Sequence, residues 1–359
     1  MCWILVVDRF DEALNYLRLV VSFRYASNTM LIRKLATLVV LYCLWTISLF
    51  GFAAVESRGE NLALSLSSLS LGTSPPLLAQ KKGFYGQEGL DVQITVVESG
   101  TRAMQALLGG SVQLASTGPE DFIRATEAGT PTVILAGVLG SLTHSLIAGP
   151  KFKRITDLRG GKVAVSGLTG SVTYALKFML AKNNLQYPKD YLMIQIGGVA
   201  VRWAALKSGG IDATLIAEPL TLVAEESGLS NLGVVGDYIP RLQVIAIAAK
   251  SDWARANRGL VVRYLKGLVR TYQWIYDNKD DAIDAAAAVA KVEKKFATRG
   301  YEIYTKRRVW PSDGSPSVEG MRVVLDYMRD GKMLTSSAGA EKYVDLSYLE
   351  QAKRELGIR

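Results

Sequence analysis

SLSSLSLGTSPPLLAQKKGFYGQEGLDVQITVVESGTRAMQALLGGSVQLASTG, residues Ser65 to Gly118, alternates apolar runs with loops of small polar residues. The apolar run from Leu62 to Leu66 predicts a strand, and Asp91 to Val97 alternates as a half-buried strand does. Pro75-Pro76 suits the first turn of a helix, where a missing N–H leaves no hydrogen bond unmade. The order strand, helix, strand, helix, strand predicts an open α/β sheet.

Small polar loops follow each of these predicted strands. In an open α/β sheet, the loops at the carboxyl ends of the strands converge on a ligand crevice. Thr101 can cap a helix from Arg102 to Leu108, as hydroxyl side chains commonly do. The loops offer hydroxyls and backbone N–H groups, which favour a binding site over a catalytic one. The ligand-binding candidates from this part of the chain are Ser70, Thr73, Thr101, Ser116 and Thr117.

The segment PPLLAQKKGFYGQEGLDVQI also resembles a signature of the substrate-binding proteins of ABC importers for nitrate, sulfonate, taurine and thiamine precursors. The likeness continues through LRGGKVAV at Leu158–Val165, GGIDATLIAEP at Gly209–Pro219 and VEGMRVVLDYMRDGKML at Val318–Leu334. It covers the chain from about residue 60 to the C-terminus. The positions that fill the first pattern are Ala79, Gly83, Phe84, Glu88, Gly89, Leu90 and Val92.

This resemblance implies a type II periplasmic binding protein fold, in which two similar α/β lobes are joined by a double-crossover hinge. It implies a monomeric extracytoplasmic receptor that captures a small solute between its lobes and delivers it to an ABC transporter permease. The hydroxyl-rich loops suit a sulfonate, a nitrate, a carboxylate or a small heterocycle equally well. No catalytic residue, metal ligand or cofactor is indicated.

An internal repeat supports two lobes without reference to any family. Ala106-Leu107 followed by Gly110 to Gln113 aligns with Ala205-Leu206 followed by Gly209 to Asp212, at a constant offset of 99 residues. Each copy is a helix that ends at glycine and leads into a short strand. Such helix–glycine–strand junctions also recur in unrelated α/β proteins. Gln113 stands where the family more often has Asp.

The predicted domain map follows from these elements. Residues 61–148 together with 243–359 form the first lobe, and residues 152–240 form the second. The chain is expected to cross between the lobes near residues 149–152 and again near 240–244.

The N-terminal region is interpreted separately. Leu35 to Phe52 is mostly apolar, follows Arg33-Lys34 and precedes Ala53-Ala54, which describes a secretory signal over residues 30–54. The run is also long enough at the lower limit to be a retained membrane anchor. Residues 1–29 are either the result of a start codon chosen too early or a genuine amphipathic extension.

Composition limits the function. The chain has 359 residues and a formal net charge of +9, yet its basic residues are scattered among acidic ones and no nucleic-acid motif is present. We therefore expect no binding to nucleic acid. The two cysteines, Cys2 and Cys43, both precede the predicted lobes, which excludes a cysteine nucleophile or a cysteine metal site there.

The second lobe and the hinge supply the remaining candidates. Thr169, Gly170 and Ser171 open a predicted helix, whose N–H groups and dipole favour an anion. Ordinary helix capping is compatible with the same pattern. His144, the single histidine, follows a predicted strand and can either line the cleft near the hinge or have a structural or surface role. The last two candidates are Glu218, at the end of a predicted strand, and Trp310, which can either cover a ligand or pack beneath a loop.

Two other functions remain open. A thiamine pyrimidine synthase shares the fold that the resemblance implies, but that enzyme depends on a cysteine-rich iron motif and a reactive histidine. This chain has no cysteine after Cys43 and one histidine. A membrane-anchored sensor with the same pair of lobes would require residues 35–52 to be retained.

Overall fold

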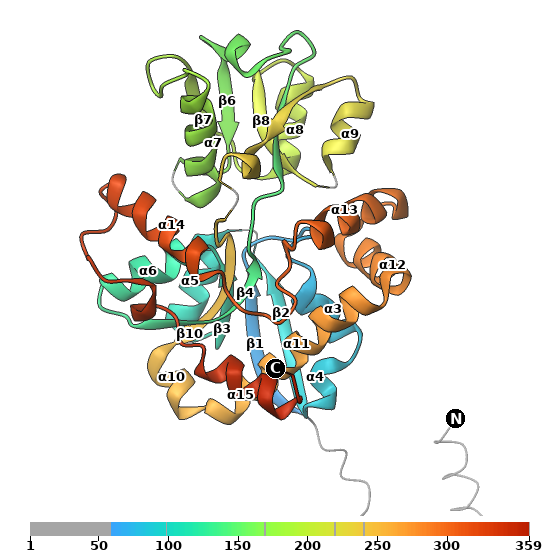
Figure 1. The fold of residues 1–359 in the computed structure, drawn as a ribbon, viewed down its shortest axis with the longest axis vertical. Coiled ribbons are helices and arrows are strands. Elements are labelled where there is room, and N and C mark those ends of the chain that lie inside the picture. Colours follow the sequence, from blue (N-terminus) through green and yellow to red (C-terminus); the bar gives the residue numbers. More distant parts are fainter. Residues whose placement is uncertain (1–58, 98, 169, 219, 240, 359) are drawn as a thin grey trace, which may run out of the picture. The chain divides into compact units, whose positions relative to one another are not determined.

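The computed structural model describes residues 59–97, 99–168, 170–218, 220–239 and 241–358 (Figure 1). The predictions for residues 1–29 and 30–54 lie outside this range. Among the described helices, none has both the length and the apolarity needed to cross a membrane.

The first lobe is built on a five-stranded sheet in the order β2-β1-β3-β10-β4. Strands β2, β1 and β3 run parallel, and β10 lies antiparallel between β3 and β4. The parallel strands β1 and β3 are buried over most of their length, as expected of a sheet covered on both faces. The strand bounds are β1 Glu60–Leu66, β2 Leu90–Val96, β3 Leu114–Thr117, β4 Thr132–Leu139 and β10 Ile245–Lys250.

The second lobe repeats this plan in the order β7-β6-β8-β5-β9. Again three strands, β7, β6 and β8, run parallel, and the fourth, β5, is antiparallel to its neighbour β8. The predicted class, two similar α/β lobes, is therefore confirmed. The bounds are β5 His144–Ala148, β6 Lys162–Val165, β7 Leu192–Gln195, β8 Ala213–Ala217 and β9 Ser230–Val234.

Helices cover both faces of the first sheet (Figure 1). Helices α5 and α6 lie on one side of it, and α3, α4 and α11 lie on the other. Pro75 and Pro76 occupy the first turn of α3, as the sequence predicts. The helices of this lobe are α3 Pro75–Lys81, α4 Phe84–Gln87, α5 Gly100–Gly109, α6 Pro119–Glu127, α10 Ser251–Ala256, α11 Arg258–Asp277, α12 Lys279–Ala290, α13 Lys294–Lys306, α14 Val318–Asp330 and α15 Ser347–Glu355, with the short 3-10 turn η3 at Ala340–Lys342.

The second sheet has its own helices. The helix predicted to start at residues 169–171 is α7, where Ala175, Leu176, Met179 and Leu180 are all buried. The elements are α7 Ser171–Lys182, α8 Val199–Lys207 and α9 Leu220–Glu226, with the 3-10 turns η1 Ile155–Leu158 and η2 Val235–Asp237.

The internal repeat extends to individual hydrogen bonds. The Gln113 side chain accepts from the Ala63 N–H at 2.9 Å, and the Asp212 side chain accepts from the Lys162 N–H at 2.9 Å. Both pairs are related by the same offset of 99 residues that the sequence shows. An amide oxygen and a carboxylate oxygen therefore tie the strands together in the same way. The departure at Gln113 is conservative for this reason.

The first crossover differs from its predicted position. The sequence places residues 61–148 in the first lobe and the crossover near residues 149–152. Instead, β5 pairs with β8 and β9 of the second sheet. The chain therefore crosses at residues 140–143, and Ala148 already belongs to the second lobe. The return crossover lies between the end of η2 at Asp237 and the start of β10 at Ile245.

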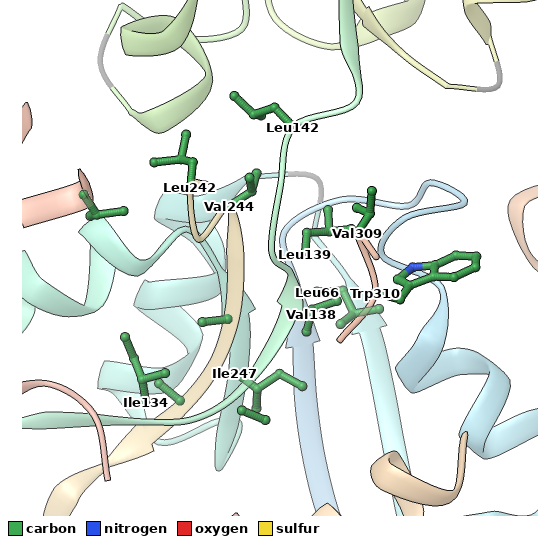
Figure 2. Packing of buried hydrophobic residues seen from close by; sticks show 14 of the residues in the cluster. Leu66, Ile134, Val138, Leu139, Leu142, Leu242, Val244, Ile247, Val309 and Trp310 are labelled. Carbon is green, nitrogen blue, oxygen red and sulfur yellow. The ribbon is translucent and has the colours of Figure 1, made fainter. Parts of the chain in front are cut away.

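Apolar packing continues along both crossovers (Figure 2). Leu142 from the first crossover, and Leu242 and Val244 from the second, are buried in the same cluster as the strand residues Leu66 and Leu139. The hinge is thus packed with side chains.

Candidate functional site

The loop after β1 is held together by its own hydroxyls. The Thr73 hydroxyl accepts from the Ser70 N–H at 3.0 Å, lies 3.1 Å from the Ser70 hydroxyl and can donate to the Ser68 carbonyl at 3.0 Å. Thr73 is buried and Ser70 is half-buried. Thr73 therefore shapes this loop, and the less buried Ser70 is better placed to meet a ligand.

The loop after β2 corrects one expectation. Thr101 is not the cap of α5, because the Ser99 side chain accepts from the Arg102 N–H at 3.4 Å and occupies the capping position. Thr101 is the second residue of α5, and its side chain is exposed. The sequence presented two hydroxyls here, and the earlier one is in the extended conformation that a helix cap adopts.

The last two residues of β3 are Ser116 and Thr117, which are both buried. The Thr117 hydroxyl donates to the Asp121 carboxylate at 2.7 Å, and the Ser116 carbonyl accepts from the Ser67 N–H at 3.0 Å. Strands β1 and β3 are paired, so the two loops that follow them lie side by side.

A residue that the sequence analysis did not select connects the end of β3 to the second lobe. Glu120 lies in the first turn of α6 and is 6% exposed. Its Oε1 atom accepts from the Ser171 N–H at 3.1 Å and lies 3.4 Å from the Ser171 hydroxyl. Ser171 opens α7, so a carboxylate of the first lobe occupies the N-terminus of a helix in the second.

The loop after β6 is shaped to admit this carboxylate. Gly170 has φ +102°, a conformation that favours glycine, and a Cβ placed there would lie 3.1 Å from the Glu120 Oε1 atom. Ser171 is buried beside it. Thr169, the third candidate in this loop, lies outside the described residues.

Two tyrosines flank the same contact. Tyr327 of α14 and Tyr174 of α7 stack with ring centroids 4.6 Å apart and planes at 22°. Burial, and then the charge of Glu120, raise the pKa of the Tyr327 hydroxyl. Burial likewise raises the pKa of Glu120 itself. The carboxyl end of β3 and the start of α7 at Gly170 and Ser171 are therefore brought together, but around an acid, Glu120, that the sequence analysis did not select.

Glu218 lies at the carboxyl end of β8 and is half-buried. Its N–H donates to the Thr143 carbonyl at 3.4 Å, and its carbonyl accepts from the Tyr304 hydroxyl at 3.4 Å. Burial raises the pKa of its carboxyl group. The backbone of Glu218 therefore joins the second lobe to the first crossover and to α13.

Trp310 lies in the core of the first lobe at 1% exposure. Its Nε1–H donates to the Gly72 carbonyl at 2.9 Å, and its ring packs against Tyr304 with centroids 4.9 Å apart. The sequence allowed Trp310 either to cover a ligand or to pack beneath a loop, and this geometry corresponds to packing. Trp310 supports the loop that holds Ser70 and Thr73 from beneath (Figure 2).

His144 opens β5, directly after the first crossover. Burial, and then the charge of Arg202, lower the pKa of its imidazole to about 4. Within the described residues its Nδ1 atom is buried without a hydrogen-bond partner. His144 is therefore neutral at pH 7 and unsuited to bind an anion by charge.

The lowered pKa of His144 predicts how the free energy of unfolding depends on pH. In the unfolded chain a histidine titrates near pH 6.5, so between about pH 4 and 6.5 the unfolded chain binds the extra proton. The free energy of unfolding should therefore rise with pH across this window, by up to about 3 kcal/mol. Urea unfolding at several pH values measures it. His144→Gln should remove this contribution, and an unchanged pH dependence in the variant would contradict the assignment.

The chain matches a known protein family. The family model described as NMT1/THI5 like matches residues 72–282, which is more than half of the chain. The binding protein YtlA of Bacillus subtilis is 24% identical over 245 residues, which cover 66% of this chain and 73% of YtlA.

Solved structures show the same fold. The alkanesulfonate-binding protein SsuA from Xanthomonas axonopodis pv. citri has a TM-score of 0.65 at 18% identity, with 80% of this chain and 99% of that chain covered. The periplasmic nitrate-binding protein NrtA from Synechocystis PCC 6803 has a TM-score of 0.69 at 18% identity, covering 83% and 89%. The fold is that of the periplasmic binding proteins, and the chain belongs to the NMT1/THI5-like family.

Proposed function

We propose that this protein is an extracytoplasmic receptor that captures a small solute between its two lobes and delivers it to an ABC transporter permease. The observation that carries the proposal is the contact between Glu120, just after β3, and Ser171, which opens the helix that follows β6. Both residues lie at the carboxyl end of a parallel strand, which is where open α/β sheets bind ligands. The binding-protein relatives and solved neighbours support the same reading.

The contacts between the lobes suit a reversible closure. Exposed ion pairs join Lys295 to Glu226 at 3.5 Å and Arg307 to Asp237 at 3.0 Å. Exposed pairs of this kind contribute about 0–1 kcal/mol each. They can therefore break and form again as a solute enters and leaves.

The hydrogen bonds and the pKa of the candidate side chains favour a receptor over an enzyme. The Thr73 and Thr117 hydroxyls are engaged in their own loops, and His144 has a pKa far too low for a general base at pH 7. The synthase alternative would also need cysteines, and none follows Cys43.

Hinge closure provides the test. A thermal-shift screen of sulfonates, nitrate, carboxylates and nitrogen heterocycles should yield a solute that adds about 2.7 kcal/mol of stability at 100 times its dissociation constant. Small-angle X-ray scattering with that solute should show a smaller radius of gyration, because the lobes are joined by two crossovers and can rotate as rigid bodies. An unchanged radius at saturation, for every solute that stabilises the chain, would contradict a hinged receptor.

A further inference from the structure

The site between α6 and α7 is built around a carboxylate. Besides Gly170, the loop after β3 makes room for it: a Cβ at Gly118 would lie 2.6 Å from the Glu120 Oε1 atom. A side chain at either glycine would press against the carboxylate. Two glycines and the first N–H of a twelve-residue helix therefore surround one acid.

This acid changes what the N-terminus of α7 can bind. The free N–H groups and the dipole of a helix favour an anion at that end. Here Glu120 already supplies one, and a second anion would face it at short range, which destabilises both charges. Arg124, the basic residue of the helix α6 that carries Glu120, is paired with Asp121. The site therefore disfavours the anionic solutes that the sequence analysis considered.

The carboxylate also has unused capacity. Among the described residues, its Oε2 atom and the hydroxyl of Tyr327 are buried without a well-formed hydrogen bond, and the two groups lie close enough for Glu120 to raise the pKa of Tyr327. A buried acceptor without a partner is costly, so a donor is expected to reach it in some state of the protein. An N–H group of a solute fits Oε2, and Tyr327 can either donate to the solute or accept from it.

Other groups at the same edge of the second sheet agree with this. Glu218 follows β8, and its Oε2 atom also lacks a partner among the described residues. Exposed apolar side chains follow the three parallel strands: Leu168 after β6, Val199 after β7 and Leu220 after β8. Binding sites for organic molecules commonly combine apolar walls with a few polar groups.

We propose that the solute is neutral or cationic, that it presents an N–H donor on an apolar body, and that Glu120 accepts a hydrogen bond from it. This inference rests on the proposed receptor function and specifies its substrate class. Glu120 would then hold α7 with one carboxylate oxygen and the solute with the other, so the solute would bind to both lobes through one side chain.

Three probes that share a phenyl ring test the inference on the full chain: benzamidine, benzamide and benzenesulfonate. Isothermal titration calorimetry measures their dissociation constants at pH 7. A hydrogen bond to a charged group implies that benzamidine binds at least about tenfold more tightly than benzenesulfonate. Glu120→Gln keeps an oxygen for the Ser171 N–H but removes the charge. The amide nitrogen that replaces Oε2 cannot accept an N–H, so the variant should weaken benzamidine about ten- to hundredfold, weaken benzamide by a smaller factor because it carries no charge, and strengthen benzenesulfonate.

Glu302→Gln is the matched control, because Glu302 is an exposed acid on α13, and it should leave all three constants unchanged. The inference is overturned if benzenesulfonate binds as tightly as benzamidine, or if neither benzamidine nor benzamide binds. It is also overturned if Glu120→Gln leaves the ratio of the benzamidine and benzenesulfonate dissociation constants unchanged. If nitrate or a sulfonate reduces the radius of gyration in the scattering experiment and benzamidine does not bind, the proposed substrate class is refuted. The proposed receptor function would remain intact.

Discussion

Replacing Trp310 with alanine should lower the free energy of unfolding by about 3–5 kcal/mol, the range found for large aromatic side chains removed from a core. Trp310 is 1% exposed and packs against Tyr304 and Tyr301. The change also removes the donor to the Gly72 carbonyl. Thermal unfolding followed by circular dichroism should show a melting temperature lower by about 10 °C for a chain of this size.

Trp310→Phe separates the two contributions. The phenyl ring keeps part of the packing and loses the N–H, so we expect a loss of about 1–3 kcal/mol, mainly from the unpaired carbonyl. The loop that Gly72 belongs to also carries Ser70 and Thr73, so the alanine variant should bind solute more weakly as well. A melting temperature within 2–3 °C of the parent, roughly the effect of 1 kcal/mol, would show that Trp310 is not the support inferred here.

The fold was predictable because its elements have strong local patterns. Asp91 to Val97 alternates, and the strand β2 spans Leu90–Val96. The apolar stripe that begins near Val172 is buried in α7. The sequence pattern does not show which strands a short strand pairs with. The few apolar residues around Leu146 fit either sheet, so the pattern could not assign them to one lobe. Only the pairing of β5 with β8 and β9 locates the first crossover.

The site was predictable in its loops and not in its chemistry. Ser116 and Ser171 lie at strand ends that do come together, as the topology of open α/β sheets implies. Glu120 was missed because an acidic residue in the first turn of a helix is ordinary and needs no further explanation. Its partner lies 51 residues away in the other lobe, and no local pattern reports such a contact.

Gly236→Ala should be the most damaging small change at the hinge. Gly236 lies in η2, just before the return crossover, and a Cβ there would lie 2.2 Å from the carbonyl oxygen of Leu142 in the first crossover. Neither backbone can yield as a flexible side chain would, so the two crossovers must move apart. We expect a loss of about 3 kcal/mol or more, at or above the upper end for overpacked sites. Urea unfolding of the variant measures it.

The same substitution at Gly259 is the matched control. Gly259 lies within α11 and a Cβ there would meet nothing within 4 Å. Alanine has the better helix propensity, so Gly259→Ala should raise stability by about 0.5–1 kcal/mol. Because Gly236 lies where both crossovers touch, its variant should also change the radius of gyration of the solute-free chain, and the control should not. Equal stabilities for the two variants would mean that the crossovers are free to separate, and the hinge would then not depend on the close contact at Gly236.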